Sequence, residues 1–117
     1  MNKIKILIPV YNDWWSVFKL LENINSQTPT LNNEFSVLIV NDASTESRPE
    51  FLADLNNLKS IQIMNMKENM GHARCNAVGL KHINEKEDFD YVIPMDGDGE
   101  DRPEELSLLI EKIKEYP

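Results

Sequence analysis

The chain has 117 residues, of which 41% are hydrophobic and 27% charged, so it is long enough for one domain with a packed core. This composition is typical of a soluble globular protein and excludes a disordered or fibrous chain. The formal net charge of -8 and the lack of any Lys/Arg-rich run argue against a nucleic-acid ligand, because nucleic acids are polyanions.

The N-terminal sequence and the cysteine count bear on the cellular compartment. The first apolar run ends at Pro9 and is too short for a signal peptide or a membrane-spanning helix. Cys75 is the only cysteine, so no disulfide can form within the chain. Both observations favour a cytoplasmic protein, in which Cys75 is an ordinary helix residue.

The first half of the chain predicts two strands and a helix between them. Residues 4–8 and 35–40 are apolar runs rich in β-branched residues, as in buried strands. Asp13 can cap the intervening helix. The apolar positions of this helix recur at the spacing of one buried face: Trp14, Val17, Phe18, Leu21 and Ile24.

Further helices and strands follow in alternation. Ser47 and Glu50 form a capping-box pattern, which predicts a second helix with Leu52, Leu55 and Leu58 as its apolar stripe. Residues 61–64 predict a third strand and residues 73–83 a third helix. Residues 89–95 predict a fourth strand. A last helix is expected after a second capping pattern, Asp101 with Glu104, with an apolar stripe of Leu106, Leu109, Ile110 and Ile113.

This alternation predicts the fold class. Strand and helix repeat four times, which indicates right-handed crossovers and a mostly parallel sheet. The expected fold is α/β, a Rossmann-like three-layer sandwich with helices on both faces of the sheet, in one domain over residues 1–117. Pro94 lies in the last predicted strand and cannot donate to a ladder, so it marks that strand as an edge or a bulge.

Polar residues follow every predicted strand. In an open parallel sheet, ligands bind beyond the carboxyl ends of the strands. Each of these residues alone could be a cap or a turn former, but together they predict a polar site along one edge of the sheet. They are Tyr11, Asn12, Asn41, Asp42, Asn65, Asn69, Asp96 and Asp98.

The sharpest of these features is the sequence Asp96-Gly97-Asp98. Two carboxylates two residues apart can point at one hard cation, and oxygen ligands suit Mg²⁺ or Mn²⁺. Such a cation would hold a diphosphate and stabilise a leaving group. The alternative interpretation is an acidic turn that caps the next helix.

Other phosphate and metal motifs do not match. An EF-hand loop that begins at Asp96 would need glycine where Asp101 stands and an acid where Ser107 stands. A dinucleotide-binding fold would need a glycine-rich turn after the first strand, and Tyr11-Asn12-Asp13 is not one. No Walker loop occurs in the sequence.

Four motifs in order resemble the family-two inverting glycosyltransferases, which have the GT-A fold. Pro9-Val10-Tyr11-Asn12 resembles the opening Pro-X-Tyr-Asn of that family, and Asn41-Asp42-Ala43-Ser44 resembles its Asp-Asp-Gly-Ser turn. Asn69-X-Gly71 resembles its Asn-X-Gly motif. Met95 to Pro103 resembles its Asp-X-Asp stretch, and is most similar to the branch of the dolichol- and polyprenyl-phosphate hexosyltransferases.

The resemblance implies a role for each matching residue. Tyr11 and Asn12 would line the base and ribose pocket, and Asp42 would accept a hydrogen bond from the nucleobase. Asp96 would approach the ribose or a metal-bound water, Asp98 would ligate the metal, and Glu100 would lie near the metal and phosphates. The expected donor-binding residues are Pro9, Tyr11, Asn12, Asp42, Asn69, Gly71, Arg74, Asp96 and Gly97, and the expected metal ligands are Asp98, Asp96 and Glu100.

The resemblance also implies substrates and partners. The donor would be a UDP- or GDP-linked sugar bound with Mg²⁺ or Mn²⁺, and the acceptor a polyprenyl phosphate or a saccharide. The chain is shorter than the family's domains, so we expect it to be the N-terminal donor-binding part. No residue can be assigned as the catalytic base. We also expect a homo-oligomer, and a full-length protein that is cytoplasmic or peripheral to the membrane.

Two functions of other classes stay open. One is a non-catalytic module that binds a nucleotide sugar without turnover. The other is a nucleotidyltransferase on a related fold, which would need a glycine- and arginine-rich loop after the first strand. That loop is absent from the sequence.

Overall fold

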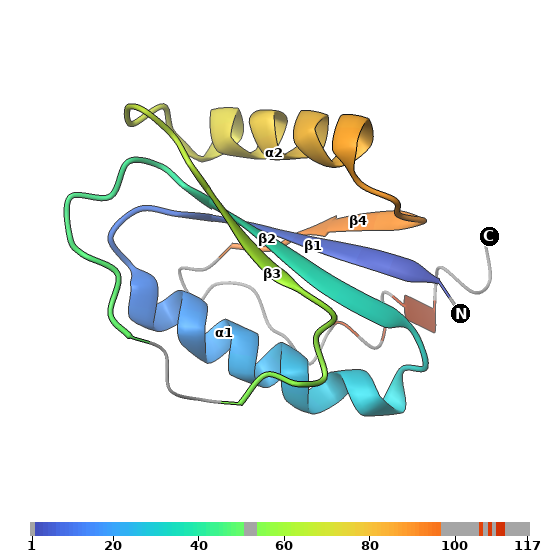
Figure 1. Ribbon diagram of the computed structural model, residues 1–117. Helices are drawn as coiled ribbons and strands as arrows, with labels where there is room; N and C mark the ends of the chain where they lie inside the picture. The colour runs from blue at the N-terminus through green and yellow to red at the C-terminus, as the bar shows by residue number, and fades with distance from the viewer. Residues whose placement is uncertain (1, 51–53, 97–105, 107, 109, 112–117) are drawn as a thin grey trace.

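A computed structural model describes residues 2–50, 54–96, 106, 108, 110 and 111, and its strands form one parallel sheet (Figure 1). The strands are β1 (Lys3–Val10), β2 (Glu34–Asn41), β3 (Ile61–Asn65) and β4 (Tyr91–Pro94). They are ordered β3-β2-β1-β4, and every neighbouring pair is parallel. The predicted strands are therefore confirmed.

Helices cover both faces of the sheet. Helix α1 (Trp14–Gln27) lies on one face and α2 (His72–Lys86) on the other, as Figure 1 shows. A short 3-10 helix, η1 (Thr28–Thr30), follows α1. The three-layer α/β arrangement expected from the sequence is confirmed.

The alternation of side chains along β1 divides the core into two clusters. Ile4, Ile6 and Ile8 pack on the α1 side, with the apolar face of α1 that the sequence predicted. Leu7 points to the opposite face. There it packs with Leu38, Val40, Cys75 and Ile83. Successive strand residues face opposite sides, so one strand of mixed apolar residues serves both layers.

The last predicted helix is described at four positions. Leu106, Leu108, Ile110 and Glu111 are helical. Leu106 and Ile110 are buried in the same cluster as α1, as their spacing predicts. The remaining positions of this helix, including its Asp101–Glu104 capping pattern, lie outside the described residues.

Helix α2 lies very close to the sheet at Gly79. A Cβ atom added there would stand 2.5 Å from Leu7 Cδ1 and 3.2 Å from Val40 Cγ2. A residue with a side chain would therefore fit at this position only if the ends of the Leu7 and Val40 side chains shifted.

The helix predicted from Ser47 and Glu50 is wrong in its described part. Residues 47–50 and 54–58 are not helical. Instead, Asp54 accepts a hydrogen bond from the Asn56 N–H at 2.9 Å, and Asn25 of α1 accepts one from the Asn57 N–H at 3.0 Å. Asp and Asn side chains that bind nearby backbone groups compete with helical hydrogen bonding, which explains the irregular segment.

The N-cap of α1 is at the predicted residue, but its side chain does not make the expected capping hydrogen bond. Asp13 is the N-cap residue, and its carbonyl oxygen accepts from the Val17 N–H at 3.3 Å. Its carboxylate makes no capping hydrogen bond. The backbone alone therefore closes the first turn of the helix.

Strand β4 has β1 as its only neighbour among the described strands, which agrees with Pro94 as a mark of an edge strand. The Met95 N–H donates to the Leu7 carbonyl at 2.9 Å and continues the pairing past the proline.

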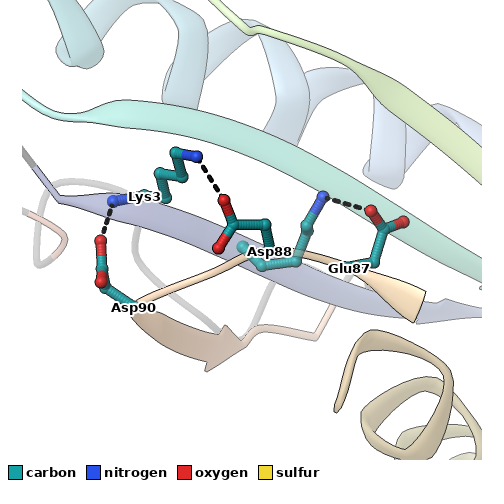
Figure 2. Close-up of polar contacts among 5 residues, drawn as sticks. Lys3, Glu87, Asp88 and Asp90 are labelled. Atoms are coloured by element: carbon teal, nitrogen blue, oxygen red, sulfur yellow. Dashed lines mark hydrogen bonds and ion pairs between the residues drawn. The ribbon is translucent and has the colours of Figure 1, made fainter. Parts of the chain in front are cut away.

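Charged contacts fix the amino-terminal end of the same pair (Figure 2). Lys3 donates to Asp88 through its ammonium and to Asp90 through its backbone N–H, and Lys5 pairs with Glu87 at 3.6 Å. These contacts lie at the opposite end of the sheet from the polar residues that follow the strands. None of the helices that the structure describes is both long and apolar enough to span a lipid bilayer.

Candidate functional site

The loops that follow the strands meet at one edge of the sheet. Val10, Asn41 and Asn65 are direct partners at the ends of β1, β2 and β3. The chain turns away from the sheet after each of them, on the left side of Figure 1. The convergence predicted from the sequence is therefore present.

Asn12 ties the loop after β1 to the loop after β2. Its backbone N–H donates to Ser44 Oγ at 2.9 Å, and its side-chain Nδ2 donates to Thr45 Oγ1 at 3.0 Å. Its Oδ1 accepts from the Glu46 N–H at 2.9 Å. The φ of Asn12 is 62°, a left-handed conformation that asparagine tolerates better than most residues. Asparagine at this position therefore fixes the shape of two loops at once.

Asp42 is the most completely bonded polar residue described at this edge. It is 1% exposed, and its oxygens accept from the Met70 N–H at 2.7 Å, the Gly71 N–H at 2.9 Å and Asn69 Nδ2 at 3.1 Å. The buried thiol of Cys75 lies beside the same carboxylate and affects its ionisation. A carboxylate has about four lone-pair sites, so the three hydrogen-bond donors occupy most of its capacity. We call this group the Asp42 clamp.

The clamp sets the ionisation of its two titratable members. Burial by itself raises the pKa of Asp42, but hydrogen bonds from Met70, Cys75 and Gly71, with His72 nearby, outweigh it and lower the pKa below its ordinary value. Burial, and then the hydrogen bond to Asp42, raise the pKa of Cys75 to about 12. At neutral pH the aspartate is therefore charged and the thiol protonated, and a protonated thiol is a poor nucleophile.

The clamp also places the first turn of α2 beside the end of β4. Gly71 has a φ of +90°, a conformation that favours glycine, and helix α2 begins with the next residue. His72 Nδ1 lies 3.9 Å from Asp96 Oδ1, with side chains 48% and 42% exposed. Arg74 is exposed in the same turn. An imidazole and a carboxylate therefore lie close together where the sequence predicts a phosphate and metal site.

The structure brings some of the residues predicted to bind a ligand into direct contact. Asp42, Asn69 and Gly71 are in direct contact. Pro9 is buried in β1 as the partner of Val40, and Tyr11 is 41% exposed beyond the strand. Gly97, Asp98 and Glu100 lie outside the described residues. Asp96, the first carboxylate of the predicted metal motif, is partly exposed.

Two residues of the site were not singled out from the sequence. Cys75 was interpreted as an ordinary helix residue, and it is buried in α2, but its thiol also completes the Asp42 clamp. His72 directly follows Gly71 of the Asn-X-Gly motif, and that position was a signal that its side chain starts α2 at the polar edge. Its contact with Asp96 depends on a strand order that the sequence pattern did not give.

Comparisons with known proteins agree with this arrangement. The sequence model described as "Glycosyl transferase family 2" matches residues 5–117. The fold matches crystal structures of S. aureus TarS. The TarS 1-349 chain has 23% identity and a TM-score of 0.68, over 97% of this chain and 33% of that one. The structure of TarS 1-349 in complex with UDP-GlcNAc has 23% sequence identity and a TM-score of 0.69, and the match covers 97% of this chain and 32% of that one. A further TarS structure has 21% sequence identity and a TM-score of 0.61, and the match covers 94% of this chain and 20% of that one.

These matches cover unequal shares of the proteins compared. The chain spans about a third of the TarS 1-349 chains and a fifth of the further TarS chain. The likeness in structure shows the fold, a Rossmann-like α/β arrangement of the GT-A type, and the sequence match extends over nearly the whole chain. This chain therefore belongs to glycosyl transferase family 2.

Proposed function

We propose that this chain binds the nucleoside diphosphate sugar of an inverting glycosyltransferase and presents it for transfer of a hexose to an acceptor. Family membership gives the reaction class. The observation that carries the proposal is the position of Asp96, which lies at the carboxyl end of β4 and 3.9 Å from His72 at the start of α2. A carboxylate that can bind a cation and an imidazole that can bind an anion are thus adjacent.

A divalent cation is part of the proposal. Asp96 offers an accessible carboxylate, and Asp98 and Glu100 follow it in the sequence. Mg²⁺ and Mn²⁺ take oxygen ligands of this kind and keep positions open for substrate phosphates. Bound there, the cation would neutralise the charge that develops on the departing nucleoside diphosphate.

The protein's own residues would orient the donor. The exposed guanidinium of Arg74 and the imidazole of His72 lie at the N-terminus of α2, where the helix dipole also favours phosphate. Tyr11 and Asn12 would border the ribose and base. The polyprenyl-phosphate or saccharide acceptor, the membrane-peripheral location and the homo-oligomeric state stay predictions from the resemblance.

The test is isothermal titration calorimetry of UDP and GDP, each with and without Mg²⁺ or Mn²⁺. Asp98→Asn should weaken metal-dependent nucleotide binding by about tenfold or more, since it removes the principal charged ligand. Glu85→Gln is the matched control, because it changes the net charge equally. Glu85 is exposed near the far end of α2, roughly 20 Å from its N-terminus.

Two results would contradict the proposal. Nucleotide binding that does not depend on a divalent cation would remove the metal site, and equal effects of the two variants would remove the role of Asp98. An assay of donor turnover, which measures the release of nucleoside diphosphate from the sugar nucleotide, distinguishes a transferase from a module that only binds.

A further inference from the structure

Strand β3 forms one edge of the sheet, with β2 on one side and no strand on the other among the described residues (Figure 1). Its hydrogen bonds to β2 fix which of its backbone groups point outward. The Val37 N–H donates to the Ser60 carbonyl at 2.9 Å, and the Met66 N–H donates to the Asn41 carbonyl at 2.8 Å. Backbone groups alternate in direction along a strand, so those of the odd-numbered residues of β3 point away from β2.

The outward groups belong to Ile61, Ile63 and Asn65. In the part of the chain that the structure describes, no hydrogen bond engages their backbone N–H and C=O groups. The strand is also accessible, because Ile61 is 37% exposed and Gln62 and Asn65 are exposed as well. An accessible edge strand with free N–H and C=O groups is a template for pairing with another strand.

Strand β3 lacks the features that block such pairing. Charged residues and prolines protect the edge strands of many proteins, but residues 60–66 contain neither. The opposite edge of the described sheet carries both, since Pro94 lies within β4 and Asp90 and Asp96 flank that strand. Pairing with a further strand is therefore favoured at β3 and opposed at β4.

The charge around β3 favours a second copy of this chain as the partner. Copies of a chain with a net charge of -8 repel each other over most of their surface. Residues 54–68 are an exception, because the acidic Asp54 and Glu68 balance the basic Lys59 and Lys67. Two copies that meet along β3 therefore bring uncharged strands with neutral surroundings into contact.

We propose that this protein forms a two-fold dimer in which β3 pairs antiparallel with β3 of a second copy, centred on Ile63. This register places Ile63 opposite itself and Ile61 opposite Asn65 of the second copy. All outward groups of both strands then pair, which gives about six hydrogen bonds between the copies. A two-fold contact uses the same surface on both copies, so assembly closes at the dimer.

The side chains of β3 agree with this register. Residues directly opposite each other in an antiparallel pair lie on the same face of the sheet. Ile63 packs on the α1 side, where it meets Ile63 of the second copy, and Met64 packs on the α2 side opposite the second copy's Gln62. Because the two strands run in opposite directions, the polar edges of the two copies face away from each other and both stay open to ligands.

Sedimentation velocity of the full chain over a wide range of concentrations tests the assembly. The apparent mass should rise from that of one 13.5 kDa chain to twice that value and then stay constant. A monomer at every concentration, or growth beyond the dimer, would overturn the proposal.

Amide hydrogen exchange at low and high protein concentration identifies the surface. The N–H groups of Ile61, Ile63 and Asn65 should exchange at least about tenfold more slowly in the dimer than in the dilute monomer. The N–H of Met64 points to β2 and should be protected under both conditions. A dimer that forms without slower exchange at Ile63 uses another surface and refutes the pairing of β3.

Two matched double variants test the register at exposed positions. Ile61→Lys with Asn65→Glu places opposite charges across the boundary and should retain the dimer. Ile61→Lys with Asn65→Lys places like charges there and should weaken dimerisation by about tenfold. Glu85→Lys on α2 makes the same change in net charge as the second double variant and should not weaken the dimer.

Ile63→Pro gives an independent check. It removes an outward N–H from each copy and leaves the hydrogen bonds to β2 in place, as proline does on an edge strand, so this variant should be monomeric. Matching far-UV circular dichroism confirms that all variants fold like the wild type. If the two double variants dimerise equally well, or if Ile63→Pro still forms the dimer, the proposed register is wrong.

Discussion

Replacing Asp42 by alanine should destabilise the protein more than most single substitutions at a ligand-binding edge. The change removes a carboxylate that accepts three hydrogen bonds, two of them from the backbone N–H groups of Met70 and Gly71. A buried donor left without a partner costs about 1–3 kcal/mol. Met70 is 40% exposed, so water can satisfy part of the loss. We therefore expect a loss of about 3 kcal/mol in the free energy of unfolding.

Urea denaturation followed by circular dichroism measures this loss. About 3 kcal/mol is a large fraction of the ~5–15 kcal/mol that holds a typical domain folded. It corresponds to a decrease of roughly 10 °C in melting temperature for a chain of this size. A loss below about 1 kcal/mol would refute the clamp, because the three hydrogen bonds would then contribute no more than one exposed hydrogen bond.

The ionisation of Asp42 adds a dependence on pH. Its pKa in the folded protein lies below the ordinary value of 3.8, so the unfolded chain binds this proton more readily than the folded one. The stabilisation is therefore fully present above about pH 4 and is lost as the pH falls through the lowered folded-state pKa. The difference in stability between the wild type and Asp42→Ala should be constant from pH 5 to 7 and should shrink below pH 4.

Glu87→Gln provides a stability control for this experiment. It breaks the pair with Lys5, whose side chain is 7% exposed, and we expect a loss of about 2 kcal/mol. The pair lies at the opposite end of the sheet, so nucleotide affinity should not change.

If Asp42 holds the start of α2, Asp42→Ala should weaken the binding of UDP, GDP and pyrophosphate alike. If it reads the base, as the family resemblance implies, pyrophosphate binding should be unaffected.

Three further results are expected. Gly79→Ala should cost about 1 kcal/mol in urea denaturation, since overpacking against the buried Leu7 outweighs the gain in helix propensity; a more stable variant would contradict the close contact. Cys75 should resist iodoacetamide at pH 8 until the protein unfolds, because burial raises the pKa of its thiol to about 12. Gly71→Ala should lose about 1 kcal/mol through backbone strain at φ +90° alone, since nothing lies within 4 Å of the added methyl group; an unchanged melting temperature would show that the turn relaxes.

The sequence determined the secondary structure where one pattern dominates a segment. β1 and β2 are apolar on both faces, as expected of central strands in a parallel sheet covered by helices. The apolar residues of α1 repeat along one face, and that face is buried. The position of the site follows from the same pattern. In a parallel sheet all carboxyl ends meet at one edge, so polar residues after each strand must converge there.

The helix prediction was wrong where a local capping pattern competed with hydrogen bonds from distant residues. The capping pattern at Ser47 and Glu50 predicted a helix, but Asn25 on α1 holds the chain at Asn57 in an irregular conformation. A capping pattern contributes about 1 kcal/mol, too little to fix a segment against several specific hydrogen bonds from elsewhere in the fold. No local pattern reports that Asn25 and Asn57 are neighbours.

The roles of individual side chains at the edge were decided by the tertiary structure alone. The sequence placed Asp42 after a strand, but its donors lie about thirty residues later and reach it only because α2 starts above β2. The strand order puts β4 beside β1 and so brings Asp96 to His72. Sequence patterns record periodicity and turns along the chain, whereas a hydrogen bond or ion pair between distant residues depends on how the elements pack. The sequence by itself therefore fixed which edge carries the chemistry, and the packing of α2 and β4 decided which groups meet there.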